Sequence, residues 1–287
     1  MRKTIDWSDY ELIDSSCGER LERWGDVILI RPDPQVIWNT ERKNPLWHNA
    51  HARYIRSHTG GGKWQMFKKV PASWQVKYRD LVFNVKPMGF KHTGVFPEQA
   101  VNWDLAGDII RKSDRRLNVL NLFGYTGCAT IACLHAGAKV CHVDAAKGMV
   151  NWAKENAISS RVADQPVRWI VDDCAKFVAR EIRRGHKYHG IIMDPPSYGR
   201  GPNGEIWKLE ERIYEFVELC SGVLADDAEF VILNSYTTGL SPSVMEYILG
   251  TVIKSRFGGT VSSDEIGLDV TDSGLTLPCG STAIWRR

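Results

Sequence analysis

The chain has 287 residues, of which 43% are hydrophobic, enough for one large α/β domain and a smaller one rather than a fibrous or disordered chain. Four of the first ten residues are charged and no apolar run is present. We therefore expect no signal peptide or membrane anchor, and a soluble, cytoplasmic protein. The seven cysteines are scattered, with no C-x-x-C pair and no histidine at zinc-ligand spacing, so we expect reduced core thiols and no metal.

Short apolar runs broken by turn-forming residues occupy the chain from about residue 8 to 90. The run 27–30 stops at Arg-Pro-Asp-Pro, a triple glycine follows at 60–62, and the run 81–85 stops shortly before Pro87. Such runs bounded by proline and glycine are typical of strands and turns. We therefore predict a small, mainly β domain over residues 1–90.

Positive charge is concentrated in residues 42–91, although the net charge is only +3. This block holds eleven basic residues and one acid, whereas acids outnumber bases nine to five before it and 24 to 21 after it. Aromatic residues lie among the bases, including Trp47, Tyr54, Trp64, Phe67, Trp74 and Tyr78. Bases that neutralise phosphates and rings that stack on nucleobases favour an RNA-binding surface, with contacts predicted from Arg53, Arg56, Lys68 and Lys69. Alternatively, the rings fill the core of the β domain and the bases are solvated.

Strand-like and helix-like runs alternate from about residue 100 onward. We predict strands at 118–122, 139–143, 167–171, 189–193 and 229–233, and helices at 104–113, 127–137, 146–159, 174–184, 207–224 and 242–256. Two further strand-like runs, 261–268 and 280–285, end the chain. Strict alternation predicts a parallel sheet with helices on both faces, in a domain over 91–287, with ligands bound beyond the carboxyl ends of the strands.

The segment 118–127, Asn-Val-Leu-Asn-Leu-Phe-Gly-Tyr-Thr-Gly, joins the first of these strands to a helix through a turn at Gly124 and Gly127. The dinucleotide pattern G-x-G-x-x-G needs a glycine where this chain has Leu122, which disfavours a pyrophosphate ligand. Asp144, at the end of the next strand, is placed to accept both hydroxyls of a ribose. A ligand with a ribose and no phosphate fits better, and S-adenosylmethionine is the common one. Alternatively, the glycines are incidental and Asp144 is solvated.

Asp194-Pro195-Pro196-Ser197-Tyr198 directly follows the predicted strand 189–193. Two prolines have no N–H and a fixed φ, so they present rigid carbonyl groups beside the Asp194 carboxylate. Such carbonyls can accept hydrogen bonds from the edge of a planar, nitrogen-bearing group while an aromatic ring such as Tyr198 stacks on its face. The alternative is a plain Pro-Pro turn that ends a strand. Asp173 likewise has two interpretations, a contact to an adenine amino group or the cap of the helix that follows.

Together with Lys91–Gln99 and Val143–Gly148, these motifs resemble the class I methyltransferase domain of bacterial large-subunit ribosomal RNA methyltransferases, which act on cytosine C5 or guanine N7. The resemblance covers about residues 80–287 and implies a Rossmann-like, seven-stranded sheet whose closing strand pair differs from that of NAD-binding sheets. It implies S-adenosylmethionine-binding residues Phe96, Gln99, Asn121, Phe123, Gly124, Tyr125, Thr126, Gly127, Asp144, Lys147, Asp172 and Asp173. Ala100 departs from the family, which usually has arginine there.

A second departure concerns the mechanism. Methylation of cytosine C5 needs a thiolate that first adds to C6, and the resembling enzymes carry this cysteine after the fifth strand. Here residues 233–237 read Leu-Asn-Ser-Tyr-Thr, and position 197 is serine. Cys220 lies in a predicted helix, and Cys279 reaches a pocket only if the final hairpin folds over it. We therefore expect a nitrogen acceptor, positioned by Asp194, Pro195, Pro196 and Tyr198.

Three functions remain open from the sequence. The first is an RNA methyltransferase, with ribosomal RNA as the leading substrate. The second is a protein or small-molecule N-methyltransferase that uses the same Asp-Pro-Pro site. The third is an NAD-dependent oxidoreductase or a non-catalytic Rossmann module, which Leu122 and the terminal hairpin disfavour. The oligomeric state is not predicted.

Overall fold

Two compact units make up the chain in the computed structural model, which describes residues 1–4, 6–57, 61–200, 206–237 and 239–287. The C-terminal unit consists of Met1–Arg2, Val101–Ile266 and Gly280–Arg287, and the N-terminal unit of Lys3–Ala100 and Gly267–Cys279. The predicted boundary at residue 90 lies inside the N-terminal unit. The sequence also did not indicate that the segment 267–279 belongs to that unit, where the backbone N–H of Thr271 donates to the Leu12 carbonyl at 3.0 Å.

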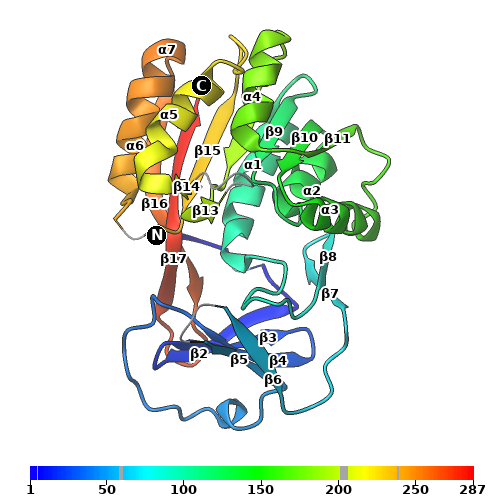
Figure 1. The fold of residues 1–287 in the computed structure, drawn as a ribbon, viewed down its shortest axis with the longest axis vertical. Helices are drawn as coiled ribbons and strands as arrows, with labels where there is room; N and C mark the ends of the chain where they lie inside the picture. The colour runs from blue at the N-terminus through cyan, green and yellow to red at the C-terminus, as the bar shows by residue number, and fades with distance from the viewer. Residues whose placement is uncertain (5, 58–60, 201–205, 238) are drawn as a thin grey trace. The chain divides into compact units, whose positions relative to one another are not determined.

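An eight-stranded sheet forms the centre of the C-terminal unit, in the order β1-β16-β17-β15-β12-β9-β10-β11 (Figure 1). The strands are β9 (Asn118–Leu122), β10 (Lys139–Asp144), β11 (Val167–Val171), β12 (Gly190–Met193), β15 (Phe230–Ser235), β16 (Thr260–Asp269), β17 (Thr276–Arg286) and the two-residue β1 (Arg2–Lys3). The seven predicted strands are confirmed, and β1 extends the edge beside β16. β17 runs antiparallel to β15, whereas the five strands from β15 to β11 are parallel. This is the closing strand pair expected from the resemblance.

Helices cover both faces of this sheet (Figure 1). They are α1 (Ala100–Lys112), α2 (Cys128–His135), α3 (Lys147–Ser159), α4 (Cys174–Arg183), α5 (Leu209–Ser221), α6 (Pro242–Leu249), a π-helical turn η3 (Gly250–Lys254) and α7 (Ser255–Phe257). On one face, Phe177, Phe216 and Leu249 of three helices pack against the buried side chains of the central strands. The predicted single helix 242–256 is instead interrupted by η3, and the predicted helix 207–224 begins only at Leu209.

A hairpin that the sequence did not predict precedes α5. β13 (Tyr198–Arg200) pairs antiparallel with β14 (Ile206–Lys208), and Tyr198 lies opposite Lys208. The hairpin follows Asp194-Pro195-Pro196 directly. It therefore ties the segment after β12 to the start of α5.

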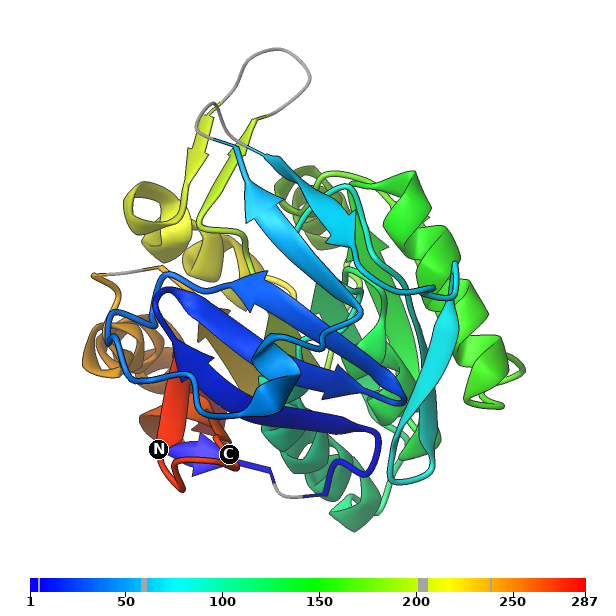
Figure 2. The same ribbon diagram turned by 90° about the horizontal axis from the view of Figure 1, so that it is seen from below.

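The N-terminal unit is mainly β, as predicted (Figure 2). Its five-stranded sheet has the order β2-β3-β4-β5-β6, and β7 and β8 form a separate pair. Bounds are β2 (Tyr10–Ser16), β3 (Glu19–Trp24), β4 (Val27–Pro32), β5 (Ala52–Arg56), β6 (Gly62–Met66), β7 (Trp74–Tyr78) and β8 (Leu81–Val85), with 3-10 turns η1 (Pro45–Trp47) and η2 (Pro97–Gln99). No helix in the described part of the chain is long and apolar enough to span a bilayer, and the same residues form no cluster suited to a metal ion.

Candidate active site

The carboxyl ends of the central strands lie side by side, because Leu122 pairs with both Val143 and Met193, and Met193 pairs with Leu233. The residue after each strand therefore lies at one edge of the sheet. This edge brings together Asp144 and Asp194, which the sequence places at strand ends, and Phe123 lies between them.

Two glycines shape the loop after β9 for different reasons. A Cβ on Gly124 would lie 2.4 Å from Cε1 and 2.5 Å from Nδ1 of His142. Gly127 has a φ of 83°, and a Cβ there would lie 2.7 Å from the Cβ of Ala153. Phe123 and Tyr125 also have left-handed φ values, 56° and 49°, a conformation that costs side-chain-bearing residues energy. Close packing thus holds the loop in a strained shape.

A buried polar chain lies beneath this loop. Asn121 Nδ2 donates to Thr130 Oγ1 at 2.9 Å, and Thr130 Oγ1 is 2.9 Å from His142 Nδ1. Burial lowers the pKa of His142 to about 3, so the ring is neutral. The Asn121 amide therefore supports the loop from within the fold, and a direct cofactor contact by Asn121 remains a prediction.

The Asp144 carboxylate is held by backbone groups on both sides. Its Oδ2 accepts the Tyr125 N–H and its Oδ1 accepts the Ala146 N–H, both at 2.8 Å. Burial raises the pKa of Asp144 and these two hydrogen bonds oppose the rise. A carboxylate has about four acceptor positions, so two remain for a pair of ribose hydroxyls. Lys147, another predicted contact, is exposed at the start of α3.

Asp172 and Asp173 both have partners within the protein. Asp172 forms an ion pair with Arg180 and accepts the N–H of Asp173. Asp173 is the N-cap of α4, and its Oδ1 accepts the Lys176 N–H at 2.9 Å. The capping interpretation of Asp173 is therefore observed. An adenine contact by either residue remains a prediction.

Two backbone carbonyls in or next to the Asp-Pro-Pro segment already accept hydrogen bonds from other residues of the chain. Trp207 Nε1 donates to the Pro196 carbonyl oxygen at 2.7 Å, and the Leu209 N–H donates to the Ser197 carbonyl at 3.1 Å. Asp194 is half-buried, and Tyr198 is 50% exposed on β13. The sequence missed the Trp207 contact because residue 207 was predicted to begin a helix.

The two positions that lack the expected thiol lie together. Thr237 Oγ1 donates to Ser197 Oγ at 2.7 Å, so two hydroxyls meet beside the Asp-Pro-Pro segment. Cys220 and Cys279 are both buried, and burial raises the pKa of each thiol well above its usual value. A buried, protonated thiol is a poor nucleophile.

Phe96 and Gln99 belong to the N-terminal unit. Phe96 is the residue before η2, its ring centroid is 5.1 Å from that of His92, and its carbonyl accepts the Gln99 N–H. Between them in sequence, Glu98 is 1% exposed, and burial raises the pKa of its carboxyl group. The cofactor contacts predicted for Phe96 and Gln99 remain predictions.

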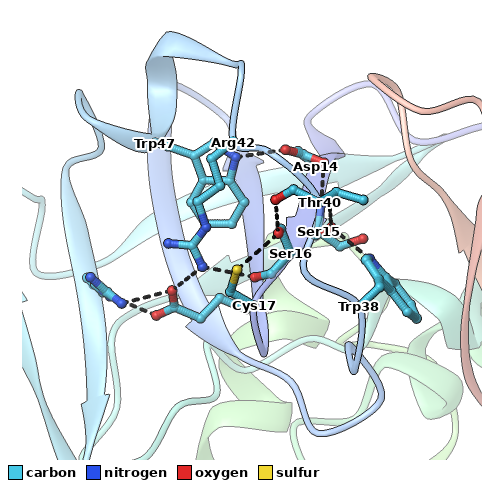
Figure 3. Close-up of polar contacts among 10 residues, drawn as sticks. Asp14, Ser15, Ser16, Cys17, Trp38, Thr40, Arg42 and Trp47 are labelled. Carbon is cyan, nitrogen blue, oxygen red and sulfur yellow. Dashed lines mark hydrogen bonds and ion pairs between the residues drawn. The ribbon is translucent and has the colours of Figure 1, made fainter.

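Arg53, a predicted RNA contact, is held by a carboxylate. Its Nε and Nη2 donate to the two oxygens of Glu19 at 2.7 and 2.9 Å, and Arg42 Nη2 donates to the same carboxylate at 2.7 Å. Figure 3 shows Arg42 over the ring of Trp47, 4.0 Å from its centroid. The indole N–H of Trp47 in turn donates to Asp14. These two arginines therefore stabilise the N-terminal unit through ion pairs with Glu19 and, for Arg42, a cation–π contact.

The aromatic residues of the basic block are mostly core residues, as in the alternative interpretation. Trp47, Tyr54 and Tyr78 are at most 6% exposed, and Trp64 and Trp74 are half-buried and donate to backbone carbonyls. Phe67 differs, since 52% of it is exposed. Five of these six rings are therefore poorly placed to stack on nucleobases. Arg56, Lys68 and Lys69 are exposed, and Lys68 also donates to the Asn49 carbonyl.

Comparison with known proteins gave solved structures that match almost the whole chain. The crystal structure of the SAM-dependent methyltransferase from Agrobacterium tumefaciens is 34% identical, with a TM-score of 0.92, and the match covers 99% of this chain and 92% of that one. No family model matches the chain.

Curated relatives share shorter stretches. The ribosomal RNA large subunit methyltransferase K/L of Shewanella frigidimarina is 29% identical over 155 residues, 53% of this chain and 21% of the relative. Its counterpart from Colwellia psychrerythraea is 22% identical over 183 residues, 63% of this chain and 23% of the relative. The chain thus spans about a fifth of the length of these relatives.

Proposed function

The chain belongs to the S-adenosylmethionine-dependent methyltransferases, and we propose that it methylates a nitrogen atom of an RNA base. The observation that carries the acceptor type is the Asp194-Pro195-Pro196 segment beside the cofactor loop, with hydroxyls of Ser197 and Thr237 where a cytosine C5 enzyme needs a thiol. The RNA class is favoured by the ribosomal RNA methyltransferases among the relatives and by the charge of residues 42–91.

The residues at the loop fit S-adenosylmethionine. Gly124 and Gly127 leave no room for side chains, and Asp144 keeps acceptor positions for ribose hydroxyls beyond its two backbone hydrogen bonds. When bound, the sulfonium supplies an electrophilic methyl group. The cofactor would be held by Phe123 to Gly127, Asp144 and Lys147, with Asp172 or Asp173 near its adenine.

Asp194 then acts on the acceptor. Its carboxylate accepts an N–H of the base edge, and the rigid carbonyls of Pro195 and Pro196 offer neighbouring acceptors. Together they hold the reacting nitrogen lone pair in line with the methyl group, a geometry that accounts for most of the rate enhancement when the nucleophile needs no activation. Tyr198, exposed on β13, is available to stack on the face of the base.

RNA binding is best explained by the outer face of β5 and β6. Arg53 lies opposite Gln65, and Ile55 lies opposite Lys63, so these four side chains share one face of the sheet. Phe67 follows in the same alternation, and its N–H continues the ladder by donating to His51. We call Arg53, Ile55, Lys63, Gln65 and Phe67 the β5–β6 face. The exposed ring of Phe67 on the same face as Lys63 offers stacking and phosphate neutralisation together.

The test is methyl transfer from labelled S-adenosylmethionine to cell RNA and protein fractions, followed by identification of the modified nucleoside. We expect label in an N-methylated nucleoside of RNA. Label in protein alone would replace this proposal with the protein methyltransferase alternative. A thermal shift with S-adenosylhomocysteine and none with NAD is the accompanying check.

Charge reversal at the two exposed lysines that follow Phe67 tests RNA binding by the basic block 42–91. Lys68→Glu with Lys69→Glu should weaken RNA binding at least tenfold and reduce the slope of log affinity against log salt by about 1.4, because each phosphate contact on a single strand contributes about 0.7. Lys112→Glu with Lys139→Glu is the matched control, since both lysines are exposed in the C-terminal unit. Equal effects of the two pairs, or none, would exclude the basic block 42–91 as the RNA-binding segment.

A further inference from the structure

Trp207 links two segments of the site that are far apart in sequence. Its ring centroid is 5.9 Å from that of Phe123, on the cofactor loop, and 5.7 Å from that of Phe216 on α5. Phe123 and Phe216 are themselves 5.4 Å apart. The same indole donates its N–H to the Pro196 carbonyl oxygen at 2.7 Å. One side chain therefore touches both the cofactor loop and the Asp-Pro-Pro segment.

The ring cluster offsets strain in the loop. Phe123 has a φ of 56°, a strained conformation for a bulky residue that persists only where its surroundings hold it. Tilted contacts with the rings of Trp207 and Phe216 stabilise that placement. Trp207 thus helps keep the loop in its bent conformation.

The hydrogen bond from Trp207 fixes the orientation of the Pro196 carbonyl group. A carbonyl oxygen has two lone pairs, and Trp207 takes one of them at Pro196. The neighbouring Ser197 carbonyl is taken by the Leu209 N–H, and Gly199 pairs with Trp207 across the hairpin. The peptide plane after Pro196 is therefore locked, and its remaining lone pair points in one direction.

We propose that Trp207 is a positioning residue. It fixes the Pro196 carbonyl relative to the cofactor loop, so that the acceptor nitrogen lies in line with the methyl group of the cofactor. The proposal rests on the proposed function, because it takes the Asp-Pro-Pro segment as the acceptor site. It goes further because it assigns a role in aligning the acceptor to Trp207 on β14, which acts through the Pro196 carbonyl and not on the reacting atoms.

The test separates the N–H from the ring. Trp207→Phe keeps an aromatic ring and removes the donor, and Trp207→3-benzothienylalanine removes only the N–H from a ring of the same shape. We expect both changes to lower kcat about tenfold, as for loss of one aligning hydrogen bond, and to raise the KM for the acceptor. The Kd for S-adenosylhomocysteine should stay within twofold of wild type.

Trp285→Phe is the matched control. Trp285 Nε1 also donates to a backbone carbonyl at 2.7 Å, that of Gly258, in the same unit. Because Trp285 is fully buried, this variant should lose at least as much thermal stability as Trp207→Phe, yet keep the wild-type kcat and acceptor KM. Equal kinetic effects at both tryptophans, or a benzothienyl variant with wild-type kinetics, would overturn the proposal.

The assay uses whichever fraction, RNA or protein, the wild-type enzyme labels. Label in protein would refute the RNA substrate, and the same comparison of variants would still decide the role of Trp207. The two proposals can therefore fail independently.

Discussion

Replacing Gly124 by alanine should distort the fold beneath the cofactor loop. The φ of Gly124 lies outside the left-handed region, so the backbone tolerates alanine and the cost is steric. The new Cβ would lie 2.4 and 2.5 Å from two ring atoms of His142, which is fully buried and bonded to Thr130. Overpacking costs about 1–3 kcal/mol and the lost hydrogen bond about 1 kcal/mol, so we expect a loss of about 2–4 kcal/mol.

Urea unfolding of four variants measures this clash. Gly124→Ala should lose the stated free energy, and His142→Ala should lose a similar amount by leaving a cavity. Because the second change removes the obstructing ring, the double variant should be more stable than the sum predicts by about 2 kcal/mol. Gly148→Ala, with no atom within 4 Å of its Cβ, should be neutral or stabilising. Additive losses, or a Gly124→Ala protein as stable as wild type, would refute the clash.

Three further predictions concern the site. Asp144→Ala should weaken S-adenosylmethionine binding by about 1.5–3 kcal/mol, the loss expected for charge-assisted hydrogen bonds, and unchanged affinity by calorimetry would remove Asp144 from the ribose site. Asp194→Ala should lower kcat at least a hundredfold with cofactor affinity retained, and RNA containing 5-fluorocytosine should form no covalent adduct; a stable adduct at Cys279 would instead indicate a cytosine C5 enzyme. The unfolded chain protonates His142 near pH 6.5 but the folded chain only near pH 3, so stability should fall as the pH drops through this window, by about 2 kcal/mol at pH 5. Urea unfolding of His142→Gln should show a flatter pH dependence, and identical slopes would contradict this assignment.

The parallel sheet could be predicted from the sequence because each buried strand is a short apolar run between helices. β9 and β11 have the predicted bounds, and β10 and β15 are one and two residues longer at their carboxyl ends. Parallel pairing then forces the ends of these strands to one edge, so the proximity of Asp144 and Asp194 follows from topology alone. No side-chain contact had to be known.

The β13–β14 hairpin could not be predicted, because its stability comes from contacts between distant residues. Ile206-Trp207-Lys208 continues into the amphipathic pattern of α5, so periodicity alone assigns these residues to the helix. What holds them extended is pairing with Tyr198–Arg200 and the bond from Trp207 to Pro196. Tertiary hydrogen bonds thus overrode the local pattern.

Burial of the aromatic rings shows a similar limit in the basic block. Charge is a property of the residue, so the excess of lysine and arginine over residues 42–91 could be counted directly. Exposure is a property of the fold, which buries Trp47, Tyr54 and Tyr78. Trp64 in β6 and Phe67 just after it point to opposite faces of the strand, so Trp64 is half-buried and Phe67 is exposed.

The acceptor assignment follows from combining sequence and structure. The sequence showed serine at 197 and no cysteine in 233–237, which left a relocated thiol open. The structure places the hydroxyls of Ser197 and Thr237 in contact and buries Cys220 and Cys279 with raised thiol pKa values. A thiolate at either cysteine would need both exposure and a nearby positive charge to form at neutral pH. An acceptor with its own lone pair needs neither, so in the proposed function the main contribution of the protein is the alignment of the acceptor by Asp194 and the Pro196 carbonyl.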